Sequence, residues 1–252
     1  MQPTVSAVAL NNILPLRRLF LQENNFQVRY NAVHERGWSD SYLVRIDGVV
    51  VGYGSVKGKD DLSLRDAIFE FYLVPAWRNY SAQLFRELVS MSRAIYVECQ
   101  SNAELITFML YEFCKDICAD VILFRDGPDT QLEIPGVVFR EWHEGDNVFE
   151  HSSEPEGSHV LEIGGEVIAT GGFLLHYNKP FADLYMEVRA DQRRKGYGSY
   201  LIQELKKACR QAGRIPAARC NITNKASKAT LLKGGMEIAG YMLSGDIRPE
   251  SL

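Results

Sequence analysis

The sequence has few of the features that mark secreted, membrane-spanning or metal-binding chains. Its five cysteines are odd in number and share no repeated spacing, which argues against a disulfide framework. The longest uncharged run, 167–178, falls well short of the roughly 20 apolar residues that cross a bilayer. No cationic segment precedes the apolar residues near the N-terminus, so we expect no secretory signal and cytoplasmic residence.

Charge of either sign is not in large excess. The 28 Lys and Arg residues are balanced by 32 Asp and Glu residues, which gives a net charge of −4. Without a basic excess, we expect no nucleic-acid partner and no membrane partner. Cys114 and Cys118 stand one helical turn apart, but no second Cys or His pair lies near them in the sequence. We therefore expect structural thiols and no metal site.

A basic turn with two glycines is the most informative segment of the chain. It follows a predicted strand, 182–188, and precedes a predicted amphipathic helix, 200–210. Its residues are Arg193, Arg194, Lys195, Gly196, Tyr197, Gly198 and Ser199. The first N–H groups of a helix have no intrahelical partner and attract anions. Glycine lets the main chain approach a ligand closely, and three successive cations favour a polyphosphate.

The spacing of the turn distinguishes it from other phosphate-binding loops. A solvated surface loop is the alternative if the turn is taken alone. The order Arg-x-x-Gly-x-Gly fits neither the dinucleotide pattern nor the ATP pattern. It resembles the pyrophosphate loop of the GNAT acetyltransferase superfamily, Gln/Arg-x-x-Gly-x-Gly/Ala. This resemblance implies that acetyl-CoA (coenzyme A) binds between the strand and the helix.

The chain contains an internal repeat. A shift of 117 residues aligns 43–54 with 160–171, and each segment predicts two strands joined by a tight turn. The same shift pairs Glu70 with Glu187, Tyr80 with Tyr197 and Leu84 with Leu201. One offset across separate segments predicts two tandem copies of one fold.

Composition places the boundary between the copies in a turn-rich stretch. We expect a degenerate first domain over 1–127, a linker over 128–136 and an acetyl-CoA-binding domain over 137–252. The second copy predicts strands at 137–142, 159–163, 167–177, 182–189, 216–220 and 236–247, with helices at 198–212 and 224–233. This order resembles the GNAT fold. The expected class is α+β, with two GNAT-like domains of mostly antiparallel twisted sheet flanked by helices, and a strand splay at the cofactor site of the second.

The first copy departs from the pattern at the turn. Asn79 and Ser81 replace Gly196 and Gly198, and Arg78 is its one cation. We expect this copy to be structural, to shape the substrate site or to form a homodimer through a spare sheet face. The alternative is that this copy binds an unidentified ligand.

A second motif follows the basic turn at the distance that the resemblance requires. Residues 224–236, with Asn224 as a predicted helix cap, resemble the GNAT segment beside the pantetheine and the thiol. An ordinary capped helix is the alternative. Many members carry a tyrosine here that protonates the departing thiolate, but this chain has Leu231. The group that would donate this proton could instead be Tyr197, Tyr241, Cys220 or a solvent molecule.

The resemblance also implies roles for individual residues. The basic turn would hold the diphosphate, and Asn224 and Ser227 would lie beside the coenzyme. The edge of Val188 and Arg189 would pair with pantetheine, and an N–H near Val188 would face the thioester oxygen. Glu187 is our candidate general base, and a salt-bridged or solvated strand residue is the alternative.

Together these features predict an acetyl-CoA-dependent N-acetyltransferase. It would acetylate a primary amine of a small molecule or a peptide by direct attack on the thioester. A catalytically silent acyl-CoA-binding or sensing module is the alternative. His176 and the acidic segment 144–156 could line an acceptor site, although ordinary solvated loops would have the same composition.

Overall fold

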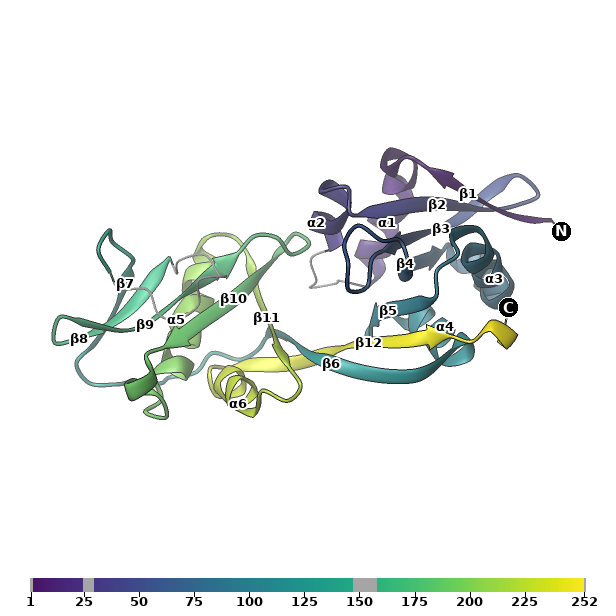
Figure 1. Cartoon of the computed structure of the whole chain (residues 1–252). Helices are drawn as coiled ribbons and strands as arrows, with labels where there is room; N and C mark the ends of the chain where they lie inside the picture. Colours follow the sequence, from purple (N-terminus) through teal and green to yellow (C-terminus); the bar gives the residue numbers. More distant parts are fainter. Residues whose placement is uncertain (1, 25–29, 147–157, 252) are drawn as a thin grey trace. The chain divides into compact units, whose positions relative to one another are not determined.

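The computed structural model describes residues 2–24, 30–146 and 158–251, which form two compact units (Figure 1). Among these residues, unit 1 comprises 2–24, 30–120 and 240–251, and unit 2 comprises 121–146 and 158–239. In this part of the chain, no helix is long and apolar enough to cross a membrane.

Unit 1 is a mostly antiparallel sheet with helices packed on it. Its own strands are β1 (Pro3–Val8), β2 (Ser39–Ile46), β3 (Val49–Lys57), β4 (Ala67–Leu73) and β5 (Tyr96–Gln100). Its helices are α1 (Leu10–Asn24), α2 (Tyr30–Glu35), the 3-10 helix η1 (Pro75–Tyr80), α3 (Ser81–Ser92), α4 (Glu104–Phe113) and the 3-10 helix η3 (Pro249–Ser251). Parts of β12 (Met236–Ile247) and β6 (Cys114–Asp126) complete the order β1-β2-β3-β4-β5-β12-β6.

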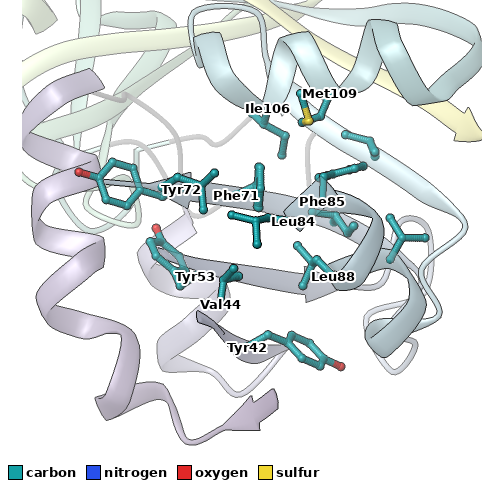
Figure 2. Packing of buried hydrophobic residues seen from close by; sticks show 14 of the residues in the cluster. Tyr42, Val44, Tyr53, Phe71, Tyr72, Leu84, Phe85, Leu88, Ile106 and Met109 are labelled. Atoms are coloured by element: carbon teal, nitrogen blue, oxygen red, sulfur yellow. The ribbon is translucent and has the colours of Figure 1, made fainter. Parts of the chain in front are cut away.

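The core of unit 1 forms because its central strands are covered on both faces. All seven residues of β4 are buried. Figure 2 shows Phe71 of this strand among Leu84, Phe85, Ile106 and Met109, which come from α3 and α4. The rings of Phe71 and Phe85 meet edge to face, with centroids 5.2 Å apart.

Unit 2 repeats the arrangement of unit 1. Its strands are β7 (Val137–Glu141), β8 (His159–Ile163), β9 (Glu166–Leu174), β10 (Phe181–Val188) and β11 (Ile215–Asn221). Its helices are the 3-10 helix η2 (Ala190–Gln192), α5 (Tyr197–Gln211) and α6 (Lys225–Lys233). The order is β12-β6-β11-β10-β9-β8-β7, again with parts of β6 and β12. The predicted element order is confirmed, except that β9 ends at Leu174 and residues 175–177 lie beyond it.

Helix α5 packs on β9 and β10 through the apolar stripe that its sequence predicts (Figure 1). Leu201, Ile202 and Leu205 are completely buried. They stand at i, i+1 and i+4, a spacing that places them on one side of a helix. This contact fixes the start of α5 next to the end of β10.

The predicted strand splay is present in unit 2. Strands β10 and β11 pair in parallel only from Phe181 opposite Ile215 to Asp183 opposite Ala217. Strand β10 nevertheless stays paired with β9 as far as Val188. The pairing of β10 with β11 therefore does not extend into the C-terminal half of β10.

The last strand of each sequence copy pairs with a strand of the other copy. β6, at the end of the first copy, pairs with β11, and β12, at the end of the second, pairs with β5. The compact units therefore divide near 120 and 240, whereas we expected a division around 128–136. Local composition does not carry information on such long-range pairing.

The segment expected as a linker is held against α5 by hydrogen bonds. Gln203, which is 5% exposed, accepts from the Thr130 hydroxyl and the Leu132 N–H, and donates to the Leu132 carbonyl. Lys206 donates to the carbonyls of Gly127 and Pro128, at 3.1 and 3.0 Å. Buried donors and acceptors of this kind fix a chain segment in one position.

Gln203→Leu is expected to release this segment. The change removes all three bonds while keeping a side chain of similar size on α5, so the amide of Leu132 should exchange faster with solvent. Hydrogen exchange followed by mass spectrometry would measure it. Gln211→Leu, on the exposed end of the same helix, is the control. Equal protection of 128–136 in both variants would contradict the prediction.

Candidate functional site

Unit 2 contains a cleft of about 730 Å³ where β10 and β11 separate. Its walls are the end of β10, the loop that follows, the start of α5 and one face of α6. Of the predicted site residues, these line it: Glu187, Val188, Arg193, Arg194, Gly196, Tyr197, Gly198, Ser199, Asn224 and Ser227. The structure therefore brings the two sequence motifs together around one space.

The end of β10 directs main-chain groups into the region of the splay, where the Val188 carbonyl accepts from Nε of Arg193 at 3.0 Å. The N–H of Arg189 donates to the Ile168 carbonyl of β9 at 3.0 Å. Alternate residues of an antiparallel pair direct their polar groups to opposite sides, so the N–H of Val188 faces away from β9. The N–H of Val188 is therefore on the side of β10 opposite β9, whereas the N–H of Arg189 is bonded to β9.

The loop leading into α5 forms a cradle of backbone N–H groups. Gly196 precedes the helix with φ +91°, and no side chain caps it. Arg194 also has a positive φ, +65°. Left-handed residues within a turn aim successive N–H groups into one concavity, and the helix dipole adds positive potential there. This geometry suits an anionic group.

Gly198 allows α5, α6 and β10 to meet closely. A Cβ at Gly198 would lie 3.0 Å from Cγ2 of Thr230 and 3.5 Å from Sδ of Met186. A side chain here would crowd the wall of the cleft. Glycine at this position therefore keeps the contact of α5 with Thr230 and Met186 free of crowding.

The cations of the loop do not all face the cleft. Arg193 and Arg194 line it, and Lys233 of α6 adds a third cation. Arg189 instead contacts Asp191, at 2.7 Å, and Glu166, at 3.3 Å. Lys195 donates to the side chain of Gln192 at 2.8 Å. Neither Arg189 nor Lys195 is among the lining residues.

Helix α6 supplies one wall of the cleft. Asn224 caps it as predicted, accepting from the Ser227 N–H at 3.0 Å. The cleft is also lined by residues that the sequence reasoning missed, namely Ala226, Ala229, Thr230 and Lys233. Their spacing of three and four residues, which marks one helix face, is the signal that could have found them.

The two glutamates matched by the repeat have different surroundings. Glu187 is half-buried and lines the cleft. Glu70 of unit 1 has no exposed surface and contacts Arg17, His34 and Tyr53 at 2.9–3.1 Å. Glu187 is therefore the glutamate of this pair that borders the cleft of unit 2.

The structure reduces the number of groups that could protonate a leaving thiolate in the cleft. Leu231 is 4% exposed and has no acidic proton. Tyr197 lines the cleft, whereas Tyr241 is not among the lining residues. Burial raises the pKa of the Cys220 thiol, which is not among the lining residues.

The segments suggested for the acceptor are only partly described. His176 lies 3.2 Å from the carboxylate of Asp183 on β10. Of the acidic segment, residues 147–156 lie outside the described part of the chain.

Comparison with known proteins agrees with this geometry. Residues 122–235 match the model of the acetyltransferase (GNAT) family. A comparison with curated proteins finds no match. A solved acetyltransferase from the GNAT family of Colwellia psychrerythraea is similar over 97% of this chain and 100% of its own, with a TM-score of 0.74 and 11% identity. A tandem GNAT protein from the clavulanic acid biosynthesis pathway is similar over 98% and 99%, with a TM-score of 0.55 and 12% identity.

The structural likeness extends over both copies, whereas the sequence match covers the second alone. At such low identity the solved structures establish the fold, and the likeness to the tandem GNAT protein over nearly the whole chain confirms the predicted tandem arrangement. Members of the matching family typically use acyl-CoA, which agrees with the cradle at the start of α5. The chain therefore has the fold of two tandem GNAT domains, and residues 122–235 match the acetyltransferase (GNAT) family in sequence.

Proposed function

We propose that unit 2 transfers an acetyl group from acetyl-CoA to a primary amine of a small molecule or a peptide. The observation that carries this proposal is the cleft at the splay of β10 and β11, which joins an uncapped helix start to a strand end that does not pair with β11. The first element suits a diphosphate and the second suits an amide-containing chain.

The residues that line the cleft indicate which groups would bind acetyl-CoA. The N–H groups of Tyr197, Gly198 and Ser199 at the start of α5 would bind the diphosphate, with Arg193 and Arg194 adding charge. The edge of Val188 would hold the pantetheine arm. Asn224 and Ser227 would support its far side from α6.

Acetyl-CoA would supply an activated thioester. The protein would then need groups that transfer protons and stabilise the negative charge on the thioester oxygen. The Glu187 carboxylate would accept a proton from the substrate ammonium, directly or through water. The Val188 N–H would stabilise negative charge on the carbonyl oxygen. Tyr197 is the cleft-lining phenol available to donate a proton to the leaving sulfur.

Glu187→Gln is expected to lower kcat for amine acetylation by about 100-fold, the scale of general-base catalysis. The coenzyme affinity should not change, because the amide keeps the size of the carboxyl. Steady-state kinetics and calorimetry with acetyl-CoA would measure the two effects. Glu166→Gln, at a side chain that is 71% exposed, is the control. A kcat equal to that of the control would remove Glu187 from the mechanism.

A catalytically silent acyl-CoA-binding module is the second candidate, which Leu231 favours because it cannot donate a proton. Release of free thiol from acetyl-CoA, measured over a panel of amines, would separate the two functions. Release with at least one amine supports the transferase. Coenzyme binding without release on any amine supports the silent module.

A further inference from the structure

A chain of hydrogen bonds in unit 1 links a serine to a buried carboxylate. The Oγ of Ser39 lies 2.9 Å from Nδ1 of His34, and Nε2 of that ring lies 3.1 Å from Oε2 of Glu70. Ser39 begins β2 and is half-buried, whereas His34 belongs to α2 and is 6% exposed. A hydroxyl, an imidazole and a carboxylate in this order are the groups that activate a serine nucleophile.

The carboxylate fixes the tautomer of the neutral imidazole. Although burial favours the neutral acid, Arg17 and His34 lower the pKa of Glu70 to about 2, so the group is ionised at neutral pH. An ionised carboxylate only accepts hydrogen bonds, so Nε2 of neutral His34 carries the hydrogen and donates it. Nδ1 then presents its lone pair to Ser39, whose hydroxyl donates. This is the protonation pattern of a general base next to a nucleophile.

The serine and the histidine both line a cavity of about 500 Å³ in unit 1. Residues 7–10 form an apolar wall, and α1 begins at Leu10 within it. The first N–H groups of a helix lack intrahelical partners and lie at its positive end, where an oxyanion is stabilised. Asp40 also lines the cavity and pairs with Arg65 at 3.1 Å. An apolar wall beside a carboxylate suits a small neutral acyl group.

We propose that unit 1 carries a second active site, in which Ser39 hydrolyses neutral short-chain carboxylic esters. The Ser39 Oγ would bond to the carbonyl carbon while Nδ1 of His34 takes the hydroxyl proton. The ester C–O bond then breaks, and the alcohol leaves with that proton. Water attacks the acyl-serine, passes a proton through Nδ1 back to Oγ, and releases the carboxylic acid. Glu70 is a positioning residue that holds the tautomer and stabilises the imidazolium.

Hydrolysis of p-nitrophenyl acetate by the full chain, in the absence of coenzyme A, tests this proposal. Ser39→Ala is expected to lower kcat/KM by at least about 100-fold, because it removes the nucleophile. A fluorophosphonate probe should label the wild-type protein at Ser39, as located by peptide mass spectrometry. Ser63→Ala is the control, since Ser63 is exposed and is not among the residues that line this cavity, and it should keep the wild-type rate and the label.

Two results would overturn the proposal. One is a Ser39→Ala protein that hydrolyses the ester as fast as the Ser63→Ala protein. The other is a folded wild-type protein that carries no label on Ser39, as expected for a polar cluster that only supports the fold. Circular dichroism of both variants would establish that they fold. The assay contains no coenzyme, so its failure does not affect the acetyl transfer proposed for unit 2.

Discussion

Replacing Gly196 and Gly198 together by valine is expected to abolish measurable binding of acetyl-CoA. A β-branched residue is strongly disfavoured at the φ of +91° that Gly196 adopts. At Gly198, even a Cβ would stand 3.0 Å from Thr230 of α6. Losing two charge-assisted N–H contacts, each worth about 1.5–3 kcal/mol, weakens affinity by more than about 100-fold. Isothermal titration calorimetry with acetyl-CoA would measure the loss.

A valine substitution at a glycine outside the cleft is the control, because it strains the backbone without changing the binding site. Gly213 has φ +71° after the end of α5, and no heavy atom lies within 4 Å of the position of its Cβ. Gly213→Val should therefore lower stability and leave coenzyme affinity unchanged. If the folded double variant binds as tightly as the Gly213→Val protein, the main chain at the start of α5 does not hold the diphosphate.

The parts of the fold that sequence could predict are those set by neighbours along the chain. The spacing of Leu201, Ile202 and Leu205 predicts the buried face of α5, and all three have no exposed surface. Asn224 predicts the start of α6, because a cap bonds to a residue three positions later. The basic turn predicts one wall of the cleft for the same reason, since its N–H groups come from consecutive residues.

The parts that sequence could not predict depend on contacts between distant residues. The pairing of β12 with β5 joins residues near 243 to residues near 99, and no local pattern indicates it. The sequence indicates that Gln203 is an exposed polar residue of a helix, yet it is buried and hydrogen-bonded to Leu132. His34, Ser39 and Glu70 come from three separate elements, so their hydrogen bonds emerge only when α2, β2 and β4 pack together.

Arg17→Met is expected to lower the free energy of unfolding by about 3–5 kcal/mol, the cost of breaking a buried ion pair from one side. The Arg17 guanidinium donates to both carboxylate oxygens of Glu70, at 2.9–3.1 Å. The side chain of Glu70 has no exposed surface, so water cannot replace the lost partner. Urea denaturation followed by tryptophan fluorescence would measure the change.

The same substitution at the surface gives a matched control. Arg125 is 60% exposed and pairs with Glu237, which is 45% exposed, so Arg125→Met should cost less than about 1 kcal/mol. The two variants should also differ in their response to pH. The pKa of Glu70 is about 2 in the native protein, below its ordinary value of 4.5, so its pairing stabilises the fold above about pH 4.5. That contribution is lost as pH falls toward about 2, so the difference between wild type and Arg17→Met should shrink over this range. A constant difference, or a cost equal to that of Arg125→Met, would show that this ion pair does not stabilise unit 1.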